Sequence, residues 1–266
     1  MNRFHAALAC VAVIGAAGAV AQQARPSKEI AAAVASPART PANVQRDRHR
    51  HPAETLAFFG VKPTHTVVEF SPGTGWYTEI LAPLVKDRGR YIAWTSTTGA
   101  ERTRAMLAAK AAQFGPTTVA TMDYATGAST VPAGSADLVL TFRNVHNILM
   151  SPNPEAPAGA FAAFYAALKP GGVLGVVDHR LPEEMDTAKE KSSGYIKRST
   201  VVRLAEQAGF RLAGESNVNA NPRDTHDYPE GVWTLPPSLA LKDVDRAKYE
   251  AIGESDRFTL KFVKPR

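Results

Sequence analysis

Short apolar runs alternate with segments of helical periodicity from about residue 66 to the end of the chain. The runs are rich in β-branched and aromatic residues, are four to seven residues long and are bounded by Gly, Pro or polar clusters, which is typical of strands. The pattern predicts strands at 66–70, 90–94, 117–122, 137–142, 172–177, 210–213 and 257–263, and helices at 77–85, 101–114, 157–168 and 200–208.

This alternation predicts an α/β protein with a doubly wound, mostly parallel sheet rather than a β-sandwich or a helical bundle. In such sheets ligands bind at the carboxyl ends of the strands, near the switch point of the strand order. The loops that follow the strands are therefore where candidate chemistry is sought.

Composition narrows the class of protein but does not choose a partner. The chain has 266 residues, of which 44% are hydrophobic, with 31 basic against 25 acidic residues and one cysteine. This is enough apolar material for one ordinary core. The basic excess is mild and by itself does not select nucleic acid or an anionic membrane surface as partner. We predict a small-molecule substrate and no nucleic acid, and the sequence leaves the oligomeric state open.

The first 21 residues resemble an export signal. Arg3 precedes an Ala/Val/Ile-rich stretch, and Ala19-Val20-Ala21 has the small-x-small form of a cleavage site. We predict a signal peptide at 1–21, a Pro/Ala-rich linker at 22–43 and one folded domain at 44–266, in a periplasmic or secreted protein. Its apolar stretch is too short for stable membrane insertion, and cleavage would remove the lone cysteine, leaving no disulfide.

The segment after the first predicted strand carries the sharpest motif, Glu69-Phe70-Ser71-Pro72-Gly73-Thr74-Gly75. An acid at the strand end is followed by two glycines and then a helix, so the backbone can approach a ligand closely. The residue three after Gly75 is Thr78, which departs from the GxGxxG dinucleotide fingerprint.

The chain resembles the class I S-adenosylmethionine-dependent methyltransferases, and within them a poorly characterised group of predicted, often exported, bacterial methyltransferases. The resemblance covers about residues 44–266. It is carried by the glycine motif with the following 76–83, by Thr141-Phe142-Arg143-Asn144-Val145-His146-Asn147, by 168–180 with its Lys169-Pro170-Gly171-Gly172, and by the tail Ile252-Gly253-Glu254-Ser255-Asp256-Arg257.

The resemblance implies a seven-stranded, Rossmann-like sheet with an antiparallel last strand, and S-adenosylmethionine as cofactor. Carried onto this chain, it places Gly73 and Gly75 under the methionine and ribose parts of the cofactor. Glu69 would either orient the loop or contact the amino group of the cofactor. Ser71, in the same loop, is also a predicted cofactor-binding residue. Asp123 matches the position that meets the adenine, although a turn cap explains it equally well.

One position departs from the family pattern. The second strand usually ends in an acid that binds both ribose hydroxyls, whereas this chain has Thr95 or Ser96 there. A hydroxyl offers a weaker acceptor than a carboxylate, so Thr95 is the predicted but weaker ribose contact, at a cost of about 1–3 kcal/mol unless another group substitutes.

The acceptor side is expected after the fourth strand, at Arg143, Asn144 and His146. A histidine can take a proton from a nucleophile near neutral pH, so His146 is the candidate base. Capping and packing is the alternative interpretation of this segment. Asp178-His179-Arg180, expected after the fifth strand, is a second pocket-facing candidate.

Two further features are weighed for chemistry. The run Arg46-Asp47-Arg48-His49-Arg50-His51 repels cations and indicates a solvated helix start or a lid over the pocket rather than a metal site, and no metal is predicted. The aromatics Trp76, Tyr77, Phe142 and Trp233 would suit an apolar or aromatic acceptor if they line the pocket, although such residues often belong to the core.

The sequence therefore predicts methyl transfer from S-adenosylmethionine to a small-molecule acceptor, whose identity it does not give. The first alternative is a non-catalytic ligand-binding module on the same fold, favoured by the export signal and the missing ribose acid. The second is a hydrolase or another enzyme that uses His146 or His179, for which no nucleophile motif is present.

Overall fold

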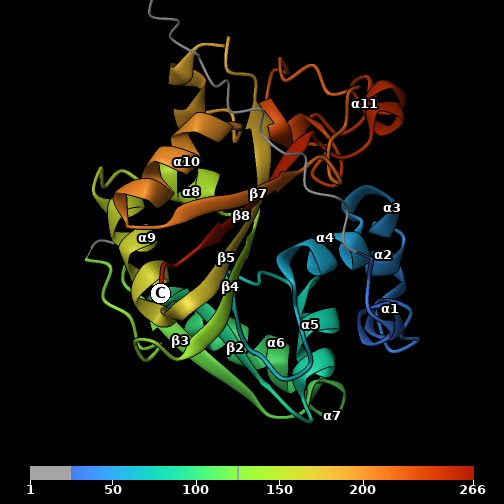
Figure 1. Cartoon of the computed structure of the whole chain (residues 1–266). Coiled ribbons are helices and arrows are strands. Elements are labelled where there is room, and N and C mark those ends of the chain that lie inside the picture. The colour runs from blue at the N-terminus through green and yellow to red at the C-terminus, as the bar shows by residue number, and fades with distance from the viewer. Residues whose placement is uncertain (1–24, 125) are drawn as a thin grey trace, which may run out of the picture.

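The computed structural model describes residues 25–124 and 126–266, and their centre is a mixed β-sheet (Figure 1). Its strand order is β3-β2-β1-β4-β5-β8-β7, with β6 paired to the end of β5. β1 to β5 are parallel, whereas β8 is antiparallel to both β5 and β7. The strands are β1 (Thr66–Phe70), β2 (Arg90–Ser96), β3 (Thr117–Met122), β4 (Ala136–Phe142), β5 (Leu168–Leu181), β6 (Ile196–Lys197), β7 (Arg211–Ser216) and β8 (Arg257–Val263).

Helices cover both faces of the sheet, and each face has its own apolar core. One core packs α8 (Val145–Leu149), α9 (Ala156–Ala167) and α10 (Arg198–Gln207) on side chains such as Val68 and Val139. The other packs α4 (Pro52–Phe59), α5 (Thr78–Val85), α6 (Ala100–Ala108) and α7 (Ala111–Phe114) against strand side chains that point to the other face of the sheet, such as Val67 and Leu138. Alternate strand residues face opposite sides, which explains the continuous apolar runs of the central strands.

The predicted fold class is confirmed, and three strand predictions, 66–70, 117–122 and 257–263, have the observed bounds. The sheet has eight strands because the two-residue β6 adds to the seven expected. The helix predicted at 101–114 is interrupted at Lys110, whose φ of −130° is not helical and whose ammonium bonds Glu79 and Thr40.

The fifth strand is longer than predicted. β5 continues to Leu181, so Asp178, His179 and Arg180 lie within the strand and not in a loop after it. The cause is pairing that a single-strand pattern cannot show: β8 pairs with β5 as far as His179↔Arg257, and β6 pairs Arg180. Asp178 and His179 therefore sit on a rigid element.

An N-terminal helical layer lies outside α4 and α5. It comprises α1 (Lys28–Val34), α2 (Pro41–Val44) and α3 (Asp47–Arg50). Part of the segment predicted as a linker is thus helical, because Ile30 packs into the α4/α5 core and Arg39 makes a two-armed ion pair with Asp47 at 2.6 and 2.9 Å. The predicted signal peptide at 1–21 lies outside the described residues and stays a prediction.

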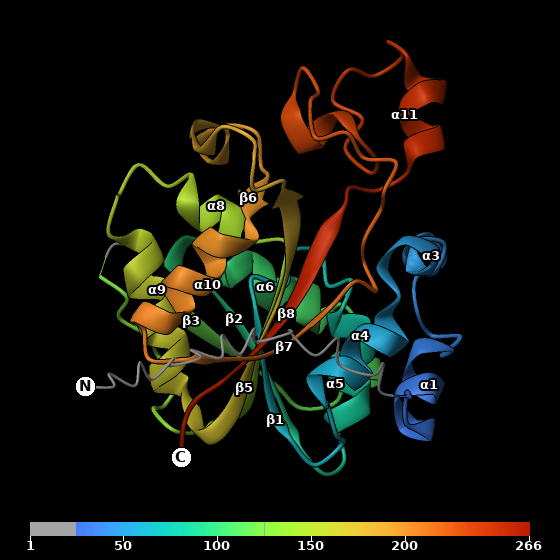
Figure 2. The same ribbon diagram turned by 45° about the horizontal axis from the view of Figure 1, so that its top comes forward.

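The remaining helix, α11 (Arg246–Ile252), lies beyond the edge at which β5 ends (Figure 2). Three 3₁₀ turns occur in the described chain, at Thr97–Gly99, Thr187–Lys191 and Gly231–Thr234. None of the helices in residues 25–124 and 126–266 is both long and apolar enough to cross a membrane.

Candidate active site

A cavity of about 320 Å³ opens at the carboxyl ends of β1, β4 and β5. The loops after these strands, α3 with the residue before it, and residues from the last 35 positions all contribute to its lining. Its lining comprises Arg46, Arg50, Glu69, Ser71, Pro72, Gly73, Thr74, Trp76, Tyr77, Phe142, Arg143, Asn144, His146, Asn147, His179, Val232, Trp233, Pro236, Pro237, Ser238, Glu254 and Ser255. This is the edge at which ligands of open α/β sheets bind.

The two glycines of the loop after β1 have different surroundings. Gly73 has a φ of +60°, and no atom lies within 4 Å of where a Cβ would be, so its bare backbone faces open space at the cavity. Gly75 has a φ of +86°, but a Cβ there would meet Met106 Sδ at 2.8 Å. Gly75 is outside the cavity lining, and the side chain of Met106 occupies its Cβ side.

Glu69 presents a buried carboxyl group at the end of β1. Its Oε2 accepts hydrogen bonds from Tyr91 at 2.6 Å and Thr78 at 2.9 Å, and the residue lines the cavity. Burial raises the pKa of Glu69 to about 7, against the opposing effect of these two hydrogen bonds. A cationic amino group in the cavity would find a partner here, so Glu69 and Gly73 fit the methionine end of S-adenosylmethionine.

Asn144 holds the loops in place. Its side-chain amide donates to the carbonyls of Phe70, Ser71 and Phe142 at 3.1–3.3 Å, which ties the end of β1 to the end of β4. Ser71 and Arg143, one after each strand, have φ values of +54° and +62°, a region that non-glycine residues adopt only when their surroundings enforce it. The predicted catalytic residue Asn144 lines the cavity but acts as this positioning clamp.

His146 faces the cavity with its other ring nitrogen fixed by a carboxylate. His146 Nδ1 lies 2.7 Å from Asp178 Oδ1, and both residues are buried. The Asp178 oxygens also accept from the backbone N–H groups of Val145, His146 and His179. This pairing makes Nδ1 the protonated nitrogen and leaves Nε2 as a proton acceptor.

His179 is the neighbouring imidazole, 5.0 Å from His146 between ring centroids. Its Nδ1 lies 2.5 Å from Ser255 Oγ. Burial, with the nearby His146 and Arg143, lowers its pKa well below the ordinary value, so His179 is neutral at pH 7. The ligand atoms of His146, Asp178 and His179 lie within 4.8 Å of one another, yet the Asp178 oxygens are already engaged by four donors, so the cluster serves a histidine–aspartate dyad better than a cation.

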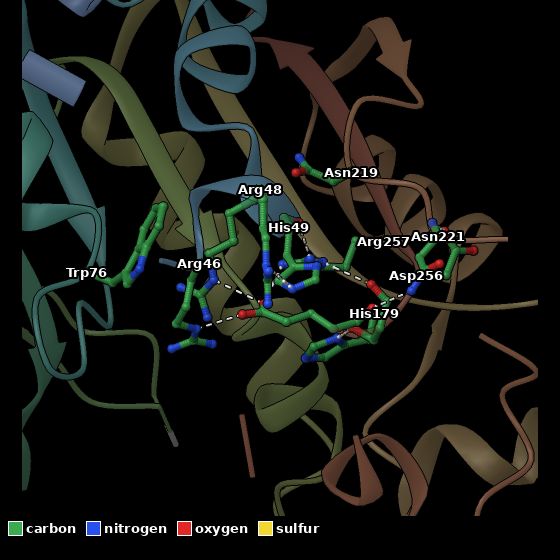
Figure 3. A network of polar contacts seen from close by, with 12 residues as sticks. Arg46, Arg48, His49, Trp76, His179, Asn219, Asn221, Asp256 and Arg257 are labelled. Atoms are coloured by element: carbon green, nitrogen blue, oxygen red, sulfur yellow. Dashed lines mark hydrogen bonds and ion pairs between the residues drawn. The ribbon is translucent and has the colours of Figure 1, made fainter. Parts of the chain in front are cut away.

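Three arginines surround the carboxylate of Glu254, which also lines the cavity. Glu254 accepts from Arg46 Nε at 2.6 Å, Arg50 Nε at 3.1 Å and Arg257 Nη1 at 3.2 Å. Arg46 and Arg257, which come from the two ends of the chain, both belong to the polar network drawn in Figure 3. Burial alone would raise the pKa of Glu254, but the guanidinium groups of Arg257, Arg50 and Arg46 outweigh it and hold that pKa well below its usual value.

Two predicted cofactor residues lie outside this cavity. Thr95 is buried at the end of β2, where its Oγ1 packs close to Gly99. Asp123 is exposed after β3, and its backbone closes a turn through Asp123 N to Ala128 O and Gly127 N to Asp123 O. The structure thus brings Glu69, Ser71, Gly73, Arg143, Asn144 and His146 together and leaves Gly75, Thr95 and Asp123 apart from them.

Sequence reasoning gave no site role to Arg46, Arg50 or Glu254. The segment 46–51 was interpreted as a solvated helix start or a lid, and the tail 252–257 entered only through the family resemblance. Arg50 is 2% exposed and Glu254 is 4% exposed, so neither is a solvated surface group. The four aromatic residues named above, Trp76, Tyr77, Phe142 and Trp233, all line the cavity.

Comparisons with known proteins relate the chain to methyltransferases. Residues 68–176 match a family described as "Methyltransferase domain". This segment of the chain is therefore similar to a methyltransferase domain. The match and the fold support a methyltransferase that uses S-adenosylmethionine, and no curated protein matches the chain.

Solved structures resemble this chain in fold at low sequence identity. A SAM-dependent methyltransferase from Aquifex aeolicus has a TM-score of 0.54 and 17% identity, with 85% of this chain and 94% of that one covered. The [4+2]-cyclase SpnF has a TM-score of 0.59 and 15% identity, with 86% and 85% covered. At these identities the likeness establishes the shared fold.

Proposed function

We propose that this protein transfers a methyl group from S-adenosylmethionine to a small-molecule acceptor bound in the cavity. The observation that carries the proposal is the arrangement of the cavity itself. Bare glycine-loop backbone, the Glu69 carboxyl and His146, which is paired with the buried Asp178, all border the same cavity. The export of the protein to the periplasm or outside the cell remains part of the proposal.

Different residues bind the cofactor, position the loop and exclude water. Glu69, Ser71 and Gly73 hold the amino-acid end of the cofactor, while Asn144 keeps the loop that carries Ser71 and Gly73 in its strained shape. Apolar walls from Trp76, Tyr77 and Phe142 exclude water from the acceptor.

The cofactor supplies an activated methyl carbon, to which the acceptor's lone pair forms a new bond while the sulfur keeps the electron pair of the breaking S–C bond. Where the acceptor carries a proton, His146 Nε2 accepts it, and Asp178 stabilises the imidazolium that results. Because the methyl group is already activated, most of the acceleration comes from positioning.

Calorimetric titration of the full-length protein with S-adenosylhomocysteine tests this proposal. Micromolar, saturable binding is expected, with ATP binding at least 100-fold more weakly because it shares the adenosine but lacks the amino-acid end. Silence at millimolar S-adenosylhomocysteine would contradict the proposal.

The affinity for S-adenosylhomocysteine should depend on pH through Glu69. Only the ionised carboxylate pairs with the ligand's ammonium, and the pKa of Glu69 in the free protein is about 7. Affinity should therefore fall on acidification through pH 7, about tenfold between pH 8 and pH 6 by single-proton linkage. Titrations across this range should show the slope in the wild type and a flat profile in Glu69→Gln; equal slopes in both proteins would remove Glu69 from the binding site.

A non-catalytic binding module is the second candidate. It is favoured by the position of Thr95 and Asp123, the predicted ribose and adenine contacts, outside the cavity. One protein of this fold, SpnF, is described as a [4+2]-cyclase, so the fold alone does not settle the chemistry. Absence of S-adenosylhomocysteine binding combined with binding of another small molecule would favour the module.

A further inference from the structure

The part of the cavity lining that surrounds Glu254 carries more positive charge than its carboxylates balance. Four guanidinium groups, those of Arg46, Arg50, Arg143 and Arg257, surround the single carboxylate of Glu254. Asp178 also interacts electrostatically with Arg143, and Glu69 also lines the cavity, but even with Glu254, Asp178 and Glu69 all counted as anions the four guanidinium groups outnumber them. Buried charge of one sign is costly unless a counter-charge is supplied.

Several of these guanidinium groups have N–H donors that no acceptor uses. Arg46 Nη2 and Arg50 Nη2 are buried and have no hydrogen-bond acceptor, although both residues line the cavity. The side chain of Arg143, also in the lining, makes no hydrogen bond or ion pair within the described part of the chain, and its backbone is held at a φ of +62° while its N–H donates to the carbonyl of Val177. Burial lowers the pKa of Arg143 to about 10, so it is still a cation at pH 7.

Guanidinium groups that line one cavity and keep N–H donors without an acceptor form a site for an anionic oxygen group. Arginine presents a planar fork of N–H donors that matches a carboxylate or a phosphate. S-adenosylmethionine cannot supply the missing charge, because its sulfonium and ammonium outnumber its one carboxylate. With the cofactor bound, the excess of positive charge would increase.

We infer that the methyl acceptor is an anion, an aromatic or apolar molecule bearing a carboxylate or phosphate group that Arg46, Arg50 and Arg143 bind. This inference rests on the proposed function and names the substrate class of the same site. The aromatic walls account for the body of such a molecule: Trp76 lies against Arg50, whose guanidinium carbon is 4.6 Å from the ring centroid, and Trp233 closes the far side.

The test compares benzoate with benzamide, which has the same ring and no charge. Both are titrated calorimetrically into the full-length protein at constant ionic strength, with and without saturating S-adenosylhomocysteine. Benzoate should bind at least tenfold more tightly than benzamide. Equal affinities of the two probes would overturn the inference.

Arg143→Gln is the decisive variant, because Arg143 has no ion pair to lose and the fold should tolerate the change. It should lower benzoate affinity at least tenfold and leave S-adenosylhomocysteine affinity within threefold, while Arg143→Lys should retain part of the benzoate binding. Arg102→Gln, an exposed arginine on α6, should change neither affinity.

The outcomes separate the inference from the proposed function. A tenfold loss of S-adenosylhomocysteine affinity in Arg143→Gln would assign this arginine to the cofactor's carboxylate and overturn the inference. Binding of S-adenosylhomocysteine without charge-dependent benzoate binding would also overturn it and leave methyl transfer standing. Charge-dependent benzoate binding without S-adenosylhomocysteine binding would support the anion site and refute the proposed function.

Discussion

Gly73→Leu is expected to weaken S-adenosylhomocysteine binding more than 100-fold, a loss of about 3 kcal/mol or more of binding free energy. The bare backbone of Gly73 faces open space at the cavity, and any side chain there would take the volume that the ligand's amino-acid end needs. Its φ of +60° also disfavours a residue with a Cβ, at a cost of about 1–2 kcal/mol in stability. Calorimetry measures the affinity and thermal unfolding measures the stability.

Gly134→Leu separates the two effects. Gly134 has a φ of +62° and open space around its Cβ position, but it is exposed in the turn before β4. Both variants should lose similar stability, and only Gly73→Leu should lose binding. Unchanged affinity in a folded Gly73→Leu protein would refute the role given to the glycine loop.

Glu254→Gln is expected to destabilise the protein by about 3–5 kcal/mol, the range found when one partner of a buried ion pair is removed. Glu254 is 4% exposed and is the acceptor shared by Arg46, Arg50 and Arg257. Glutamine keeps the shape and one acceptor oxygen but leaves three cations facing one another without a counter-charge. Urea unfolding in a buffer free of carboxylates and phosphate gives the free energy, because such anions would partly replace the lost charge.

Glu250→Gln is the matched control. Glu250 also pairs with an arginine, Arg246, at 2.8 Å, but about half of each side chain is exposed. Exposed pairs contribute about 0–1 kcal/mol, so this substitution should leave the unfolding free energy nearly unchanged. A loss below 1 kcal/mol in Glu254→Gln would mean that water or another residue compensates the arginines.

The fold was largely readable from local pattern. Buried parallel strands are continuous apolar runs, so 66–70 and 137–142 stand out without tertiary information. The full length of β5 could not be predicted in this way, because its last residues are polar and form a strand only through pairing with β6 and β8. α1 was hidden for a similar reason: its few apolar residues, such as Ile30, suffice only because α4 and α5 offer them a surface.

The candidate site was readable only in part. The glycine motif and His146 lie directly after strands, where topology predicts ligands. The partner of His146 was a separate candidate, and only the register of β5 beside β4 places Asp178 at 2.7 Å from it. Arg46, Arg50 and Glu254 were beyond reach, because residues about 200 positions apart meet through the packing of α3 against the tail, which no local spacing encodes.

The meeting of Arg46 with Glu254 has a consequence for synthesis on the ribosome. The five parallel strands are complete by residue 181, so the central sheet can begin to assemble while the final third of the polypeptide is still being translated. The guanidinium-rich wall cannot, because its carboxylate is residue 254. A nascent chain would thus acquire its hydrophobic interior first and its capacity for anion recognition last, with several like-charged side chains held apart by solvent until the tail emerges.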